Sequence, residues 1–366
     1  MMSEPVPTRR MSPKQGRVAA MKLRVFRKHL SLRHVKTTAV GSVSSVGALF
    51  VELEQDGLVG FGECCQEDQL SLGMLDALHE KIARFEGHLK NYALADPFAF
   101  ERFISPHFER EPAARCALEM AACDLWGKIR GFPLRRLWKL RSAGAVYSSF
   151  TLVRGSREST LDKLDETPDW PIYRVELNGR DDIPLLEEIR RKTDARLYIE
   201  VAGQWTLSQA LDYLPRLIAL KVDLLEQPFP ADEWEQTKIF KKHSPIPVYA
   251  DESCRSLEDI ERCVGIFDGV NLTPVKFGGM LATRRAIAAA QALGLKTMIG
   301  NPTESTVGAS AAAQFAPVLD AVCIDGPCQI KQKIGLGIEF DRGRILYPKI
   351  GGTGVSSAKT APRPPR

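Results

Sequence analysis

Three short apolar runs decide the fold: RLYIEV at 196–201, VDLLE at 222–226 and PVYAD at 247–251, which follow one another at nearly constant spacing. The series continues on both sides, so that eight runs begin at residues 147, 172, 196, 222, 247, 268, 296 and 321. Amphipathic segments such as LSQALDYLPRLIAL fill the intervals of 21 to 28 residues, so each interval holds a strand, a loop and a helix. Eight such units predict an α/β fold, a (β/α)8 barrel of the TIM type.

A doubly wound open sheet is the alternative architecture, since it is built from similar units. Its first strand is normally followed by a G-x-G-x-x-G turn, but the first run here leads into VRGSREST. The sequence therefore favours the barrel. Because functional residues gather at the carboxyl ends of barrel strands, those ends are where we look for a site.

The rest of the sequence indicates a smaller second domain. Residues 21–55 alternate apolar and polar residues through MKLRVFRKHL and ALFVELEQDG, with a polar loop between them, and GLVGFGE supplies a third antiparallel strand. A helical period follows and ends at Gly131. We expect a basic disordered tail at 1–20, an α+β capping domain at 21–140, the barrel at 141–345, a segment at 346–355 that returns to the capping domain and a disordered tail at 356–366. Translation starting at Met21 instead of Met1 remains an alternative.

Charge and composition argue against several kinds of partner. The net charge is +5, but the two tails carry +3 each, so the body carries about −1 and has no basic face for nucleic acid. No apolar stretch approaches the roughly 18 residues of a membrane helix, and the first twenty residues lack the apolar run of a secretory signal. Eight cysteines form no C-x2-C pair, so reduced thiols are favoured. We expect a cytoplasmic protein without nucleic-acid or membrane partners, and a homo-oligomer by default.

Acidic residues end three neighbouring strands of the predicted barrel: Glu200, Glu226 and Asp251. Adjacent strands lie about 4.8 Å apart, so these carboxylates repel one another unless a cation lies between them or some are protonated. A single acid at such a position is usually a helix cap or a surface charge, but three in phase predict a metal site. Oxygen ligands without His or Cys favour Mg²⁺, with Mn²⁺ as the second choice.

This pattern resembles the enolase superfamily, in particular its muconate-lactonizing branch, from about residue 21 to 355. The resemblance rests on GFGE, on ALEMAACDLWGKIRGFPLRRLW before the barrel, and on EQP, DES, K-x-G-G, NPTES and IDGP within it. Dipeptide epimerases and o-succinylbenzoate synthases have the nearest pattern. The resemblance implies that Glu200, Glu226 and Asp251 bind Mg²⁺, although the first family acid is usually Asp. It implies a lyase or isomerase (racemase or epimerase, cycloisomerase or dehydratase) that acts on the carbon next to a carboxylate of a small organic acid or amino-acid derivative.

The lysines that move the proton in that family are replaced here. Its strand-two Lys-x-Lys matches Arg174-Val175-Glu176, its strand-six lysine matches Thr273, and Lys276 corresponds to a later position. Relative to lysine, Glu176 changes the charge by −2 and Thr273 by −1, so the pocket is more negative by three charges. This disfavours an enolate, so the family's usual two-sided chemistry is not expected.

Two functional hypotheses remain open. In the first, Glu176 is a general base on one face of the substrate, with a pKa raised toward neutral by burial or by neighbouring acids. Arg174 then holds an anionic group of the substrate, and Lys276 is the remaining catalytic candidate. In the second, the protein is a catalytically degenerate member that keeps the metal and binds a ligand without turnover. Unrelated chemistry on a similar barrel is a third possibility, because fold does not fix function.

Residues expected to line the substrate side are Thr151, Asn301, Glu304, Cys323 and Asp325. The resemblance implies that Cys323-Ile324-Asp325 occupies the position of an Asp-x-Asp that binds the substrate amine in dipeptide epimerases. The absence of its first Asp weakens a dipeptide assignment, and we favour Cys323 as a small core residue.

Overall fold

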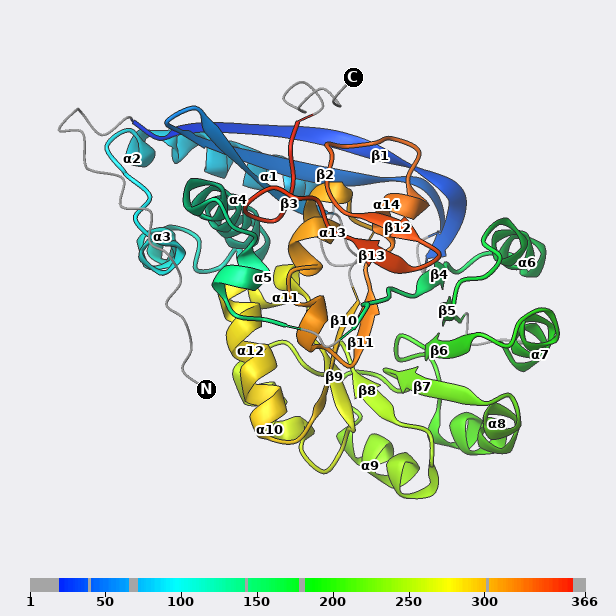
Figure 1. Cartoon of the computed structure of the whole chain (residues 1–366). Coiled ribbons are helices and arrows are strands. Elements are labelled where there is room, and N and C mark those ends of the chain that lie inside the picture. Colours follow the sequence, from blue (N-terminus) through cyan, green and yellow to red (C-terminus); the bar gives the residue numbers. More distant parts are fainter. Residues whose placement is uncertain are drawn as a thin grey trace, which may run out of the picture.

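The computed structural model describes residues 20–38, 41–65, 72–141, 144–177, 182–300 and 303–357. A parallel eight-stranded barrel forms the larger part, and a three-stranded antiparallel sheet with its helices caps one end of it (Figure 1). The predicted fold class, a TIM-like barrel with an N-terminal α+β capping domain, is confirmed.

The barrel strands follow one another around the sheet in chain order. They are β4 (Phe150–Leu152), β5 (Ile172–Glu176), β6 (Arg196–Glu200), β7 (Val222–Glu226), β8 (Val248–Ala250), β9 (Gly269–Asn271), β10 (Lys296–Gly300) and β11 (Ala321–Cys323). The N–H of Ser149, just before β4, donates to the carbonyl of Val322 in β11 at 2.8 Å and closes the circle. All eight strands expected from the spacing of apolar runs are therefore present.

Helices alternate with these strands and cover the barrel. They are α6 (Arg157–Glu166), α7 (Asp182–Lys192), α8 (Leu207–Ala219), α9 (Trp234–His243), α10 (Leu257–Cys263), α11 (Pro274–Phe277), α12 (Met280–Ala292), α13 (Thr306–Ala312), η2 (Ala316–Val318) and α14 (Gly326–Gln329). Reciprocal capping boxes begin α8 at Thr206 and α10 at Ser256, so local sequence fixes where these helices start.

The capping domain comprises β1 (Lys22–Thr38), β2 (Gly41–Gln55), β3 (Leu58–Cys65), α1 (Leu72–Arg84), α2 (Glu86–Leu89), α3 (Pro97–Ile104), η1 (Ser105–His107), α4 (Pro112–Arg130) and α5 (Leu134–Leu137). The prediction of a polar loop between the first two strands is wrong in the extent of that loop. β1 continues through it and pairs with β2 to Thr38, with a register shift between Ser31 and Lys36. This extension carries the end of β1 over the barrel.

The end of the described chain returns to the capping domain after a small hairpin of β12 (Glu339–Asp341) and β13 (Arg344–Leu346). The N–H and hydroxyl of Thr353 donate to Oδ1 of Asp124 in α4, at 2.7 and 2.9 Å. The expected domain boundaries remain predictions, and most of both expected tails lies outside the described residues. Within the described segments, no helix combines the length and apolarity needed to cross a membrane.

Candidate functional site

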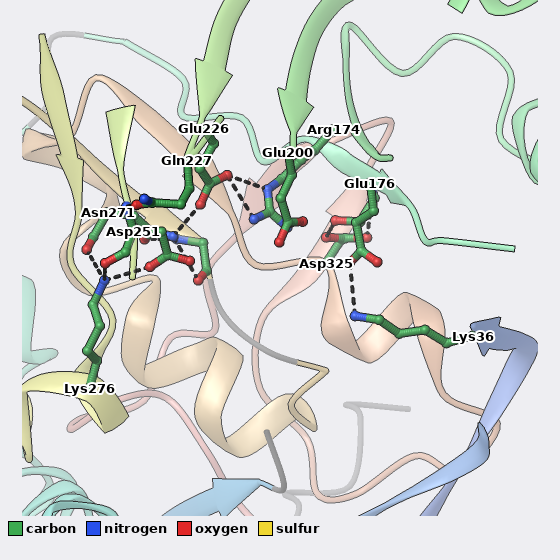
Figure 2. A network of polar contacts seen from close by, with 12 residues as sticks. Lys36, Arg174, Glu176, Glu200, Glu226, Gln227, Asp251, Asn271, Lys276 and Asp325 are labelled. Atoms are coloured by element: carbon green, nitrogen blue, oxygen red, sulfur yellow. Dashed lines mark hydrogen bonds and ion pairs between the residues drawn. The ribbon is translucent and has the colours of Figure 1, made fainter. Parts of the chain in front are cut away.

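Four acidic side chains meet where the strands end. Glu176, Glu200 and Glu226 are the last residues of β5, β6 and β7, and they lie directly opposite one another in the parallel register. Asp251 follows β8 at the same mouth, so the strand ends bring the predicted acids together (Figure 2).

Arg174 lies between two of these acids. Its Nη1 is 2.8 Å from Oε2 of Glu200, and its Nη2 and Nε are 2.8 and 2.9 Å from Oε2 of Glu226 (Figure 2). Burial lowers the pKa of Arg174, but attraction by the two carboxylates outweighs burial, so the net pKa lies well above its usual value. In this arrangement the guanidinium is already paired with two carboxylates of the protein, so it is not free to bind a substrate anion.

Lys276 is paired in a similar way with Asp251. Its Nζ lies 2.6 Å from Oδ1 of Asp251, 3.0 Å from the carbonyl of that residue and 2.6 Å from the carbonyl of Asn271. Burial lowers the pKa of Lys276, but Asp251 and the Cys254 thiol outweigh burial and leave that pKa raised. Lys276 is therefore a protonated ammonium that fixes Asp251, and a protonated amine cannot accept a proton.

Glu176 forms an ion pair with a residue of the capping domain. Nζ of Lys36 in β1 lies 3.1 Å from its Oε1, and the N–H of Arg154 donates to its Oε2 at 3.1 Å. Burial alone would raise the pKa of Glu176, but Lys36, Arg174 and the Arg154 N–H outweigh burial and lower it to about 2. The expectation of a pKa near neutral is wrong, because it did not include a cation arriving from the cap.

Three cations, Lys36, Arg174 and Lys276, pair with these four acids. Burial and the neighbouring Glu176 and Glu226 raise the pKa of Glu200 to about 8 even though Arg174 lowers it. Among the described residues, Oε2 of Glu200 receives no hydrogen bond of good angle, although Arg174 is close to it.

These acids can be tested against the requirements of a divalent cation. Glu200, Glu226 and Asp251 offer only oxygen donors, which Mg²⁺ and Mn²⁺ prefer, and the buried Oε2 of Glu200 accepts no hydrogen bond within the described residues. Their chemistry and strand positions therefore fit the ion. Their spacing is not yet that of a metal cage, because no three His, Cys, Asp or Glu side chains in the described ranges are gathered closely enough to hold a metal.

Two of the residues expected to line the substrate side, Thr151 and Asp325, bond to each other within the barrel. Thr151 donates its N–H and its hydroxyl to Asp325 at 2.8 Å each, and Gln329 donates to Asp325 at 2.7 Å. Three protein donors therefore already engage Asp325, which is also buried.

Cys323 and Glu304, also expected to line the substrate side, are buried, as is Thr273. Cys323 is buried at the end of β11, and burial raises the pKa of its thiol to about 12, which agrees with a small core residue. Glu304 is buried before α13, and Thr273 is buried directly before α11. Asn301 lies outside the described residues.

Three residues of the site were missed from the sequence. Asn271 ends β9 and donates to Oε1 of Glu226 at 2.7 Å, and Gln227 accepts the N–H of Asp251 at 2.9 Å. Both directly follow or end a barrel strand, so the strand-end rule that found the acids could have found them. Lys36 gave no such signal, because it comes from a strand of the capping sheet.

The chain matches two described protein-family domains. Residues 20–138 match the mandelate racemase / muconate lactonizing enzyme N-terminal domain, and residues 163–356 match the domain described as enolase C-terminal domain-like. The first match covers the capping domain up to α5, and the second runs from α6 to the returning C-terminal segment.

Individual proteins match over nearly the same length. An L-Ala-D/L-amino acid epimerase of Flavobacterium johnsoniae is 34% identical over 336 residues, which is 92% of this chain and 99% of that protein. An L-Ala-D/L-Glu epimerase of Bacteroides thetaiotaomicron is 30% identical, covering 93% and 89%. The solved structure of a dipeptide epimerase from Cytophaga hutchinsonii, complexed with Mg and D-Ala-L-Val, superposes with a TM-score of 0.85 at 20% identity and covers 94% of this chain and 97% of that one.

Proposed function

Because the chain belongs to the mandelate racemase and muconate lactonizing enzyme family of the enolase superfamily, we propose that it is a Mg²⁺-dependent isomerase or lyase. Its substrate is a small organic acid or amino-acid derivative, and it acts on the carbon next to the carboxylate. The observation that carries the proposal is the placement of Glu200, Glu226 and Asp251 at the ends of three adjacent strands. The epimerase names of its relatives support an amino-acid derivative, such as a dipeptide, as the first class to test.

Glu200, Glu226 and Asp251 would hold the ion, with Mn²⁺ as a substitute that prefers the same oxygen donors. A bound divalent cation supplies Lewis acidity, which makes a C–H next to a coordinated carboxylate more acidic. Lys276 acts as a positioning residue, since its ammonium fixes Oδ1 of Asp251 at 2.6 Å.

Proton transfer is assigned to Glu176 on one face of the substrate. This carboxylate is ionised at neutral pH, but its pKa of about 2 makes it a weak base, so the carbon acid must be strongly activated. Thr273 stands where the family has its strand-six lysine, and a hydroxyl does not serve as the matching base on the other face. The arrangement therefore supports elimination, cycloisomerisation or one-sided exchange over fast two-base epimerisation.

Arg174 is the residue proposed to hold an anionic group of the substrate. To do so its guanidinium must leave Glu200 and Glu226, which it contacts at 2.8 Å. Thr151, Glu304, Cys323, Asp325 and Asn301 remain proposed lining residues.

Solvent-deuterium exchange tests the function directly. We expect Mg²⁺-dependent incorporation of deuterium next to the carboxylate of a dipeptide, an N-acyl amino acid or a hydroxy acid, and its loss in Glu176→Gln. Glu187→Gln, a carboxylate on α7 that pairs with Arg216, is the matched control and keeps exchange. Binding of metal and ligand without exchange for any compound would replace catalysis with ligand binding.

A further inference from the structure

We infer that Arg174 is a tethered cation that competes with the divalent metal for Glu200 and Glu226. Metal then binds only when the guanidinium withdraws from these carboxylates. The inference rests on the proposed metal site and names a control of that site that lies within the chain itself.

The geometry of Arg174 supports this competition. Its side chain is buried, and all three of its guanidinium nitrogens lie within 2.9 Å of a carboxylate oxygen of Glu200 or Glu226. Both Nη2 and Nε contact the same oxygen, Oε2 of Glu226. One cation thus links two of the three proposed ligands.

A metal that binds the carboxylate oxygens held by Arg174 is repelled while the guanidinium stays. Mg²⁺ binds carboxylate oxygens at about 2.1 Å. An ion on Oε2 of Glu226 would therefore lie within about 5 Å of Nη2 of Arg174, which is 2.8 Å from that oxygen, and like charges at this separation repel strongly in a buried site.

The displaced guanidinium has another carboxylate on its own strand. Glu176 lies two residues further along β5, on the same face of the strand, and it already attracts Arg174 electrostatically. A shift of the guanidinium toward Glu176 would free Glu200 and Glu226 without exposing the positive charge to an apolar surface.

The same competition predicts how metal affinity responds to mutation. If the guanidinium leaves the two carboxylates only about a tenth of the time, the apparent dissociation constant is about tenfold weaker than the intrinsic one. Removing the charge removes this penalty. Arg174→Met keeps a long unbranched side chain without charge, and Arg174→Lys keeps one charge but replaces the planar fork with a single ammonium.

Two titrations of the full chain test the inference. Isothermal titration calorimetry with MgCl2 measures the dissociation constant for Mg²⁺, and electron paramagnetic resonance of the free ion during titration with MnCl2 measures that for Mn²⁺. We expect Arg174→Met to bind either ion about tenfold or more tightly than the unmodified chain, with Arg174→Lys between them. Arg196→Met, which removes an arginine paired with Asp223 at the opposite end of β6, leaves the affinity unchanged. Circular dichroism checks the fold of each variant, and if Arg174→Met fails to fold, Arg174→Lys decides the result.

The outcomes separate this inference from the proposed function. Equal affinities of the unmodified chain and the Arg174 variants would overturn the competition and leave the metal site standing. Binding by an Arg174 variant alone would support the competition and remove Mg²⁺ dependence from the native protein. If no variant binds either ion, the metal site itself is refuted, and the competition with it.

Discussion

Nζ of Lys36 lies 3.1 Å from Oε1 of Glu176, although 140 residues separate them in the chain. The ammonium comes from the capping sheet and the carboxylate from the end of a barrel strand, so one ion pair joins the two domains at the candidate site (Figure 2). This pair brings one positive charge from the cap to the acids at the barrel mouth.

Removing Lys36 should destabilise the protein most near neutral pH. Lys36→Met leaves the buried Glu176 without its cation, and we expect a loss of about 2 kcal/mol in the free energy of unfolding. The folded pKa of Glu176 lies below its ordinary value of 4.5 and that of Lys36 above 10.5. The pair therefore stabilises fully between these values, and the benefit is lost as pH falls through about 2.

Urea unfolding of Lys36→Met at pH 7 and at pH 3 measures this effect. Lys22→Met is the matched control, because Lys22 lies on the same strand as Lys36 and forms an exposed ion pair with Glu54 of β2, so its loss should cost less than about 1 kcal/mol. Equal losses in the two variants would contradict a specific role for the Lys36–Glu176 pair.

Glu119 should make stability fall as pH rises. This buried carboxyl of α4 accepts the N–H of Leu281 in α12 at 2.6 Å, and burial raises its pKa to about 8. Between its ordinary value of 4.5 and about 8 the folded state binds more protons than the unfolded state, so the free energy of unfolding decreases across this range.

Glu119→Gln keeps the acceptor and the shape without the charge. We expect it to be more stable than the unmodified chain at pH 9, by an amount on the order of a few kcal/mol, and similar to it at pH 5. Urea unfolding at both pH values tests this, with the exposed Glu109→Gln as a control. A pH dependence that persists in Glu119→Gln would assign it to another group.

Thr151 should matter to stability more than to substrate affinity. Thr151→Val removes the hydroxyl that donates to Asp325 at 2.8 Å between β4 and the segment after β11, and we expect it to cost about 1–2 kcal/mol. Thermal unfolding measures the loss. If Thr151→Val instead changes KM with no change in stability, the residue contacts substrate.

Metal addition should stabilise the folded chain. Saturating Mg²⁺ at about 100 times its dissociation constant adds about 2.7 kcal/mol, and chelation with EDTA reverses the gain. We expect a higher Tm with Mg²⁺ for the unmodified chain and no shift for Glu226→Gln. A shift of the same size in Glu226→Gln would mean that the ion binds elsewhere.

The barrel could be predicted because each strand carries its own signal. Apolar runs such as those ending at Glu200 and Glu226 repeat at a nearly constant interval, and parallel strands bring their ends to one mouth whatever the loops do. The length of β1 could not be predicted, because its outer half pairs polar residues such as Ser31 with Ser45, and polar ladders lack alternation.

The position of the site could be predicted from the sequence, but the side-chain pairing and the pKa values within it could not. Sequence located Arg174 and Glu176 on β5, yet the direction of the guanidinium depends on rotamers, and the pKa of Glu176 depends on Lys36 from a distant strand. The expectation considered burial and neighbouring acids but not Lys36, and so gave the wrong direction for that pKa. Contacts between side chains that are distant in the sequence and meet only in the tertiary fold could not be predicted in this way.

The contact of Thr353 with Asp124 makes the barrel an insertion within its own cap. The polypeptide leaves the cap after α5, forms the eight barrel strands and returns to α4. Two chain connections therefore join the barrel to the cap. A cap anchored in this way cannot drift from the barrel as a separate body. Heating should therefore melt both parts together, with a single peak of excess heat capacity.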